Sequence, residues 1–357
     1  MGTYDFGDPG IDAAVDTLIE RVAETASDHG EDLVREMVVT SLKMLVDGTE
    51  RGDLKMMNAA LKEMRYSFLV FQHYRDVRKV TMFGSARVEP NDPNYELAAA
   101  FAAQMVDRYR WMVVTGAGPG IMEAGNRGAG SDYSFGVSVR LPFEDGANPF
   151  VHESRLINYK YFFTRKLTFI KESDAFVLFP GGFGTLDESF ELLTLIQTGK
   201  SDLHPVIMLE APGTGFWGPW AEFVNTLVDQ GMIAADDLNL FTVTTSLDEA
   251  IDEIRSFYAV YHSQRYVDGD LILRLTSEPS DEVVDELNEQ FGDIVRTGQI
   301  VKIGPTPTEI ASDDFVDLAR LRFRFDRRQF GRLRCLIDHL NGKDRPLPSE
   351  TKERQRQ

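Results

Sequence analysis

The chain has 357 residues, of which 43% are hydrophobic, and a formal net charge of −19. This length and apolar content are enough for a sizeable buried core and for two or three domains. The strong negative charge argues against nucleic acid as a main partner, because a nucleic-acid backbone must be met by positive charge. No apolar run approaches the roughly 20 residues of a membrane helix, so no membrane partner is expected.

Cysteine and histidine usage excludes further classes of protein. The single cysteine, Cys335, cannot form an intramolecular disulfide, and the first residues have neither the basic nor the apolar region of a signal peptide. Both features are typical of a protein of the reducing cytoplasm, which is the location we expect. The six histidines are scattered, without H-x-x-x-H or C-x-x-C spacing, so we expect no metal site and no cofactor.

Residues 1–78 are predicted to form an N-terminal helical extension. Apolar residues recur at helical spacing in three stretches between residues 11 and 77. The polar stretch 47–53, DGTERGD, separates the second stretch from the third. We interpret the extension as a helical cap that packs on the following sheet or on a second subunit.

Residues 79–262 alternate between strand-like and helix-like segments. The strand candidates are 79–83, 111–115, 134–139, 174–179, 204–209 and 240–244. The helix candidates are 93–109, 119–129, 156–172, 184–198, 217–229 and 246–260. This order predicts an α/β fold, a Rossmann-like doubly wound parallel sheet with right-handed crossovers.

The pattern changes after residue 262. Residues 263–342 are predicted to form a small α+β module, and the polar residues 343–357 a tail. The strand candidates of the module are 271–275, 298–303 and 318–325, and its helix candidates are 281–291 and 328–340.

Seven arginines lie in the last strand and helix of this module. They are Arg320, Arg322, Arg324, Arg327, Arg328, Arg332 and Arg334. Along the strand they alternate with apolar residues, which predicts one basic face. This face is either a site for a phosphorylated effector or a surface that pairs with acidic groups of this chain or of a partner subunit.

The segment Pro180–Glu188, PGGFGTLDE, is the most informative in the chain. It follows the apolar run 175–179 and precedes a helix-like segment, so it is predicted to be a turn from strand to helix. Glycines at 181, 182 and 184 allow close approach of the backbone to a ligand. The first amides of the helix would then point at an anion, and Thr185 would cap the helix or bind an oxygen. Glu188 follows one turn later, beside the same opening.

Two further glycine-rich turns follow apolar runs in the same way. One contains Gly116, Gly118 and Gly120, and the other contains Gly84 and Ser85. Because the carboxyl ends of parallel strands meet at one crevice, these turns predict a site for a nucleotide-type ligand. The motif G-x-x-x-x-G-K-[ST] and a clean G-x-G-x-x-G with its distant acid are both absent, which disfavours phosphotransfer and dinucleotide redox chemistry.

Pro180–Glu188 fits the PGGxGTxxE motif of the Lonely Guy family, and Arg165-Lys166 matches the Arg-Lys pair of that family. The resemblance covers residues 79–262, about half of the chain. Members of this family hydrolyse nucleoside 5'-monophosphates to free base and ribose 5-phosphate, although many long carried the label "lysine decarboxylase". The resemblance therefore implies a hydrolase, an N-glycosidase of the phosphoribohydrolase type, that works as a homodimer or larger homo-oligomer.

The resemblance also implies roles for single residues. Cleavage of an N-glycosidic bond leaves positive charge on the ribose, which Glu188 would stabilise, while Arg165 would neutralise phosphate or support the leaving base. Phosphate and ribose would lie against the three glycine-rich turns, and the base would lie near Phe162 and Lys166. The chain departs from common family residues at positions 117, 162, 164 and 195. The preferred base, including any cytokinin base, is therefore not predicted, and a non-catalytic nucleotide-binding regulator on the same fold remains the alternative.

Overall fold

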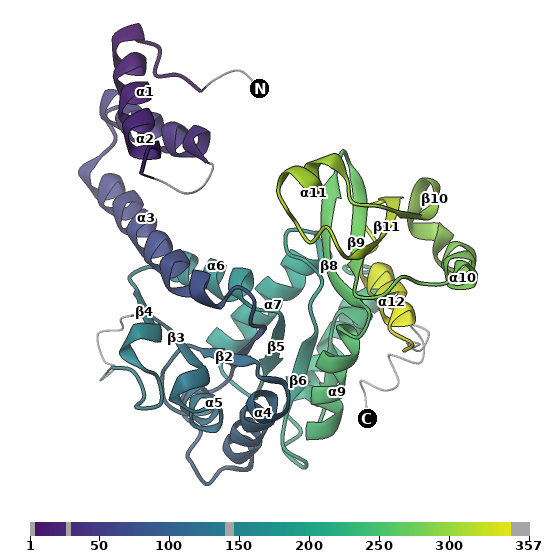
Figure 1. Ribbon diagram of the computed structural model, residues 1–357. Helices are drawn as coiled ribbons and strands as arrows, with labels where there is room; N and C mark the ends of the chain where they lie inside the picture. The colour runs from purple at the N-terminus through teal and green to yellow at the C-terminus, as the bar shows by residue number, and fades with distance from the viewer. Residues whose placement is uncertain (1–3, 26–29, 140–145, 344–357) are drawn as a thin grey trace. The chain divides into compact units, whose positions relative to one another are not determined.

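The computed structural model describes residues 4–25, 30–139 and 146–343, and the chain forms two compact units, Met1–Arg65 and Tyr66–Gln357 (Figure 1). None of the helices in the described ranges has the length and apolar character needed to cross a membrane.

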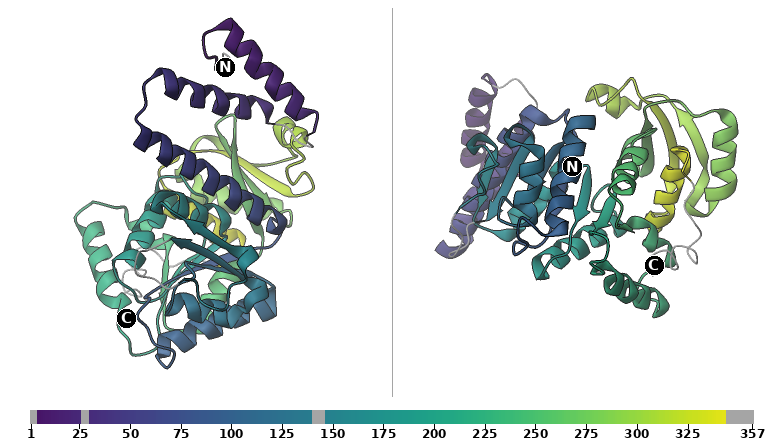
Figure 2. Two further views of the ribbon diagram at one scale, coloured as in Figure 1. Left: turned by 90° about the vertical axis from the view of Figure 1, so that its left-hand side faces the viewer. Right: turned by 90° about the horizontal axis from the view of Figure 1, so that it is seen from below.

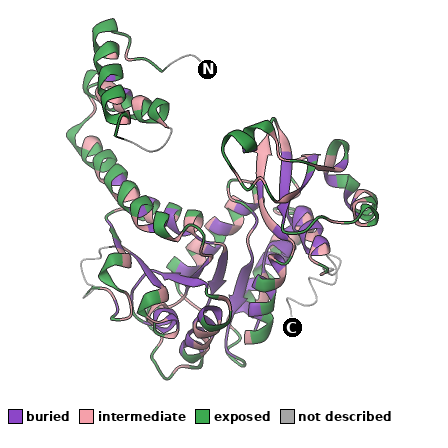
Figure 3. Cartoon of the chain, viewed as in Figure 1, coloured by how far each residue is buried: buried purple, intermediate pink, exposed green. Residues whose placement is uncertain are grey.

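The first unit consists of helices. It contains α1 (Pro9–Ala23), α2 (Glu31–Val46) and most of α3 (Arg51–Phe71), which confirms the predicted helical extension. Helix α1 begins where the Asp8 side chain accepts hydrogen bonds from two backbone amides, and a salt bridge of 2.6 Å joins Arg35 of α2 to Asp16 of α1. Few side chains of this unit are buried, so its apolar stripes remain largely exposed (Figure 3).

The second unit contains a seven-stranded parallel sheet in the order β4-β3-β2-β1-β5-β6-β7. Its strands are β1 (Lys79–Phe83), β2 (Met112–Thr115), β3 (Ser134–Val139), β4 (Leu156–Tyr159), β5 (Ala175–Leu178), β6 (Val206–Leu209) and β7 (Thr242–Thr244). Most of these strands are buried along their whole length, as expected when helices cover both faces of a parallel sheet. The predicted doubly wound α/β fold is confirmed.

Helices cover the two faces of this sheet (Figure 2). They are α4 (Pro93–Tyr109), α5 (Ile121–Ala129), α6 (Phe162–Glu172), α7 (Phe183–Gln197), α8 (Trp217–Asp229) and α9 (Leu247–Phe257). Buried side chains of α4, α5 and α9 form one apolar cluster with the sheet, and those of α6, α7 and α8 belong to another. Strands β2 to β4 lie on one side of β1, and strands β5 to β7 lie on the other side. Because the strand order reverses between β1 and β5, the crevice at their carboxyl ends is the expected ligand site of such a sheet.

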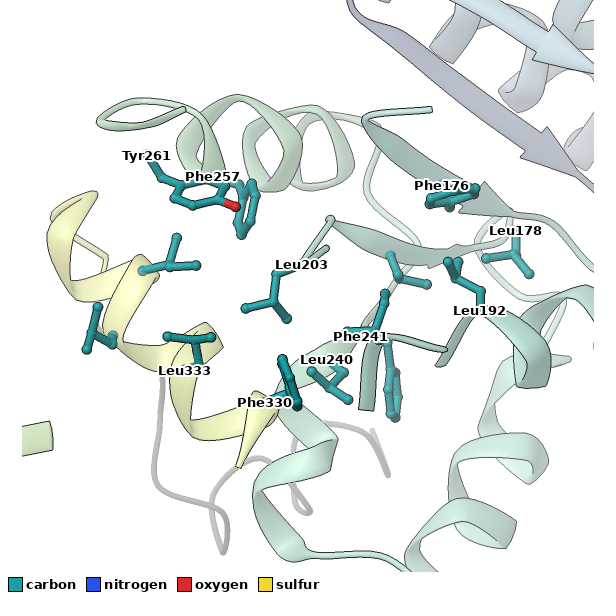
Figure 4. Close-up of a cluster of buried hydrophobic side chains, with 14 of the residues drawn as sticks. Phe176, Leu178, Leu192, Leu203, Leu240, Phe241, Phe257, Tyr261, Phe330 and Leu333 are labelled. Atoms are coloured by element: carbon teal, nitrogen blue, oxygen red, sulfur yellow. The ribbon is translucent and has the colours of Figure 1, made fainter. Parts of the chain in front are cut away.

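The last part of the chain forms a four-stranded antiparallel sheet in the order β10-β11-β9-β8. Its elements are β8 (Tyr261–Val267), β9 (Asp270–Leu275), α10 (Asp281–Phe291), β10 (Val295–Ile303), α11 (Pro307–Ala311), β11 (Ala319–Phe325) and α12 (Phe330–Leu340). Leu333 and Phe330 of α12 lie in the same buried cluster as Phe176 and Leu178 of β5 (Figure 4). The small sheet and the large sheet therefore share one continuous hydrophobic core.

Three details of the sequence-based prediction were wrong. The segment 156–172, predicted as one helix, is strand β4 followed by α6, because Ile157 and Tyr159 are buried beside β3 in parallel register. Strand β8 and the short helix α11 were not predicted. Strand β8 carries mostly polar residues, so it lacked the apolar alternation on which the prediction depended.

The predicted basic face of the C-terminal module is divided by the structure. Arg320 and Arg334 are buried and paired, with Glu309 at 3.1 Å and with Glu253 at 2.6 Å, respectively. These two arginines are therefore part of the buried interior and not of an exposed basic face. Arg322 and Arg324 remain 48% and 42% exposed.

Candidate active site

A pocket of about 620 Å³ opens at the carboxyl ends of β1 and β5. Among its lining residues are the following predicted site residues: Gly84, Ser85, Phe162, Arg165, Gly181, Gly182, Gly184, Thr185 and Glu188. Its volume lies within the usual range for pockets that bind small molecules. The structure thus brings together predicted site residues that are as many as 104 positions apart in the chain, from Gly84 to Glu188.

Backbone hydrogen bonds hold the three glycine-rich turns together. The Ser85 amide donates to the Pro180 carbonyl at 3.0 Å, and the Ser85 carbonyl accepts from the Ile121 amide at 3.0 Å. A β-carbon at Gly120, where φ is +69°, would lie only 2.3 Å from the Ser85 carbonyl oxygen. Gly120 is therefore needed for the close contact between the second and third turns.

Helix α7 begins among the lining residues of the pocket, and its N-cap residue is a glycine. Gly182 is its N-cap residue, its first turn carries no acidic side chain, and no side chain of the described residues caps this end by a hydrogen bond. The first amides of a helix have no acceptor within the helix itself, and the helix dipole adds partial positive charge there. This end of α7 can therefore bind an anion such as a phosphate.

Gly181 and Thr185 shape the same end of α7. A β-carbon at Gly181 would lie 2.1 Å from Thr185 Oγ1 and 3.1 Å from the Ser85 amide nitrogen. Thr185 is itself buried. Only glycine at position 181 allows the turn to close over the threonine.

Arg165 projects from α6 toward the end of β2. Its Nε donates to the Val137 carbonyl of β3 at 3.0 Å, and its guanidinium carbon lies 5.3 Å from the centre of the Phe169 ring. A β-carbon at Gly116 would lie 2.7 Å from Arg165 Nη2. Glycine at position 116 thus leaves room for the guanidinium group.

Two of the predicted phosphate-binding glycines have a similar spacing role. Like Gly120, Gly116 and Gly118 are not among the residues that line the pocket, and a β-carbon at Gly118 would lie 2.7 Å from Met122 Cε. Met122 does line the pocket. The second glycine-rich turn therefore accommodates Arg165 and Met122, which reach the pocket in its place.

Glu188 lies one turn inside α7, with its side chain 11% exposed. Burial raises its pKa from 4.5 to about 7, although the positive charges of Lys166 and Arg165 oppose this shift. Among the described residues, no donor forms a hydrogen bond with its carboxylate; Lys166 Nζ lies 4.0 Å away. The carboxylate therefore retains its capacity to accept hydrogen bonds from a bound molecule.

Lys166 and Phe162, the two residues predicted to lie near a base, differ in their positions. Phe162 lines the pocket and is half-exposed. Lys166 does not line it, because its ammonium group forms salt bridges of 2.7 Å with Asp187 and 2.5 Å with Glu191. Lys166 thus connects α6 to the acidic side of α7.

Several lining residues were missed by the sequence-based prediction: Phe83, Ala86, Arg87, Met122, Phe183, Leu186, Asp187 and Phe216. Arg87 directly follows the turn at Gly84, so its position in the sequence was a usable signal. Phe216 comes from the loop before α8, well away from every motif, and no local pattern could have identified it. Across the described ranges, no group of three or more His, Cys, Asp or Glu side chains could hold a metal ion.

Known proteins resemble this chain mainly in its central part. Residues 116–254 match the model of a family described as "Possible lysine decarboxylase". The chain is 30% identical over 93 residues, 26% of its length and 37% of the relative's, to the probable cytokinin riboside 5'-monophosphate phosphoribohydrolase LOGL2 of Oryza sativa subsp. japonica. It is 27% identical over 172 residues, 46% of its length and 68% of the relative's, to the cytokinin riboside 5'-monophosphate phosphoribohydrolase LOG of the same plant.

A solved structure is also similar. The molybdenum cofactor binding protein of the phototrophic bacterium Rippkaea orientalis is 21% identical with a TM-score of 0.36, over 50% of this chain and 96% of that one. The chain spans less than half the length of the first curated relatives that it matches.

Proposed function

Because this chain belongs to the Lonely Guy family through its central part, we propose that it hydrolyses the N-glycosidic bond of nucleoside 5'-monophosphates. The products are the free base and ribose 5-phosphate. The observation that supports this proposal most is the pocket itself, in which an uncapped helix start lies one turn away from a buried carboxylate. An anion-binding end and a carboxylate at this spacing suit a phosphorylated sugar.

In this proposal the 5'-phosphate binds to the first amides of α7. Gly181, Gly182, Gly184 and Thr185 surround it, together with Gly84 and Ser85 of the adjacent turn. Anchoring the phosphate at this end orients the ribose toward Glu188. Such positioning lowers the barrier because the reacting groups no longer have to be brought together in the transition state.

Glu188 acts on the ribose. The transition state of glycosidic cleavage carries positive charge on the sugar, which a carboxylate stabilises while it also accepts hydrogen bonds from hydroxyls or orients water. A pKa of about 7 leaves a large fraction of Glu188 as carboxylate near neutral pH. Arg165, held by Val137 and Phe169, supplies the compensating positive charge to the phosphate or to the leaving base.

The base lies near aromatic side chains of the pocket. Phe162 and Phe216 line the pocket, whereas Lys166 does not line it and is paired with Asp187 and Glu191 of α7. Both relatives named above carry the words "cytokinin riboside 5'-monophosphate" in their names. The candidate substrates are therefore cytokinin riboside monophosphates and common nucleotides such as AMP and GMP.

The decisive experiment measures ribose 5-phosphate released from a panel of nucleoside 5'-monophosphates and from the matching nucleosides. We expect turnover of at least one monophosphate and little action on its nucleoside, because the phosphate site contributes only to the former. Equal rates on both would contradict the proposal. Tight binding of monophosphates without any turnover would favour a non-catalytic nucleotide-binding regulator.

Assembly and regulation belong to the same proposal. The protein works in the cytoplasm as a homodimer or larger homo-oligomer, to which the exposed apolar helices of residues 9–65 offer surface. The module 263–342 tunes activity, and its exposed arginines Arg322 and Arg324 offer a site for a phosphorylated effector. Light scattering of the full chain at micromolar concentration tests the assembly, since a fully active monomer is incompatible with it.

A further inference from the structure

Lys166 occupies a position for which the proposed reaction gives no role. Its ammonium group is only 15% exposed and forms salt bridges with Asp187 at 2.7 Å and Glu191 at 2.5 Å. Glu188, which lies between these two acids in the sequence, has its Oε2 4.0 Å from the same nitrogen. One positive charge is therefore shared by three carboxylates within two turns of α7.

Other charged groups around Glu188 come from two further directions. Arg165, also on α6, is held against β3 through the Val137 carbonyl, and Arg87 lines the pocket from the turn after β1. Neither forms a salt bridge with Asp187 or Glu191 among the described residues. Within the described ranges, Lys166 is thus the cation that forms salt bridges with both acids that flank Glu188 on its own helix.

We propose that Lys166 is a positioning residue that keeps Glu188 in its carboxylate form by neutralising Asp187 and Glu191. This inference rests on the proposed function for its catalytic consequence, though not for its electrostatic one. Without the ammonium group, the two flanking acids would repel a third negative charge in a buried site. Glu188 would then take up a proton and lose the charge that stabilises the ribose cation.

The state of Lys166 itself agrees with this role. Burial works against its charged form, but hydrogen bonds to Asp187 and Glu191 more than offset burial and raise its pKa above the usual value. Lys166 thus stays charged over the whole range in which Glu188 titrates. The same contacts fix its side chain between α6 and α7, so its charge remains at a constant distance from Glu188.

The test compares the pH dependence of three full-length variants with that of the wild type. In Lys166→Met, the acidic limb of kcat/KM should move to higher pH by roughly one unit, since this limb reports the essential carboxylate of the free enzyme. Lys166→Arg keeps the charge and should restore the wild-type profile. The double variant Asp187→Asn/Glu191→Gln leaves Lys166 unopposed and should move the limb to lower pH.

A direct titration separates this inference from the proposed function. Carbon-13 NMR of protein labelled at glutamate carboxyls, with Glu188→Gln to assign the signal, gives the pKa of Glu188 without any substrate. If no nucleotide is hydrolysed, the proposed function fails, yet the same shifts of the Glu188 signal would still support the role of Lys166. An unchanged Glu188 titration in Lys166→Met overturns it. If that variant does not fold, an unchanged or raised titration in the double variant overturns it equally.

Discussion

Two glutamates on helices, Glu188 at the pocket and Glu309 in the C-terminal module, are both shielded from water. Their partners differ, and their pKa values are shifted in opposite directions. Glu309 is fully buried in α11, where it accepts hydrogen bonds from the Thr306 amide and hydroxyl and pairs with Arg274 and Arg320 at 2.9 and 3.1 Å. Although burial alone would raise its pKa, these partners lower it to about 2. Glu188 has no such donors among the described residues, and burial raises its pKa to about 7.

The difference separates an acid that is fully paired within its own chain from one that we propose to be reactive. The oxygens of Glu309 are occupied by partners of its own chain, so it joins α11 to β9 and β11 and has no capacity left for a ligand. Glu188 lines a pocket, and its carboxylate accepts no hydrogen bond from the described residues. Its raised pKa reflects the free-energy cost of keeping the charged form in a buried environment. A group kept in an unfavourable environment in this way is typical of a functional site.

The largest expected effect is the loss of turnover when Glu188 is substituted. Glu188→Gln keeps the size of the side chain but removes the charge, so we expect turnover of the best monophosphate to fall by roughly 10²–10⁴-fold. Glu222→Gln, an exposed glutamate of the neighbouring helix α8, is the matched control and should keep wild-type activity. A Glu188→Gln enzyme that retains more than a third of the activity would remove Glu188 from the mechanism.

The corresponding change at Glu309 should act on stability and leave the chemistry of the pocket unaltered. Glu309→Gln leaves two arginines near a neutral partner in a buried site, which should lower the free energy of unfolding by roughly 3–5 kcal/mol at pH 7. Because the pKa of Glu309 is lowered, this stabilisation is complete above its unfolded value of 4.5 and disappears as pH falls through about 2. Urea unfolding measures it, with the exposed Glu289→Gln of α10 as control.

Glu188→Gln should have the opposite effect on stability. The folded protein binds the Glu188 proton below about pH 7, whereas the unfolded chain releases it above 4.5, so the carboxylate destabilises the fold increasingly as pH rises between these values. At pH 8 the variant should be more stable than the wild type by up to about 3 kcal/mol, and below pH 4.5 the difference should vanish. Equal unfolding midpoints at pH 8 would mean that Glu188 is not held in an unfavourable state.

The smallest effect is expected at the cap that holds Glu309. Thr306→Ala removes a hydroxyl that donates a hydrogen bond to the Glu309 carboxylate and accepts one from the Glu309 backbone amide. We therefore expect a loss of about 0.5–2 kcal/mol in the free energy of unfolding. The pKa of Glu309 should rise because one lowering partner is gone. Thr308→Ala, exposed on the same helix, serves as control, and an equal loss there would contradict a specific role of the cap.

Much of the fold followed from local sequence patterns. Apolar runs of four to six residues marked most strands of the large sheet, and the helical spacing marked the helices between them. The glycine-rich turns could be located because each directly follows such a run. Strand β4 was missed because LINY is too short to be distinguished from the start of the helix that follows it.

The sequence by itself determined the parallel sheet and the glycine-rich turn at Pro180–Glu188 with Glu188 one helical turn beyond its glycines. The tertiary structure decided which side chains meet there: Arg165 reaches the end of β2 because Gly116 leaves space, and Lys166 meets the acids of α7 instead of a base. It also decided that Arg320 is interior while Arg322 is exposed, although both alternate along one strand. Burial and charge partners depend on residues distant in the chain, such as Arg274 and Glu309, 35 positions apart, and no local pattern records such contacts.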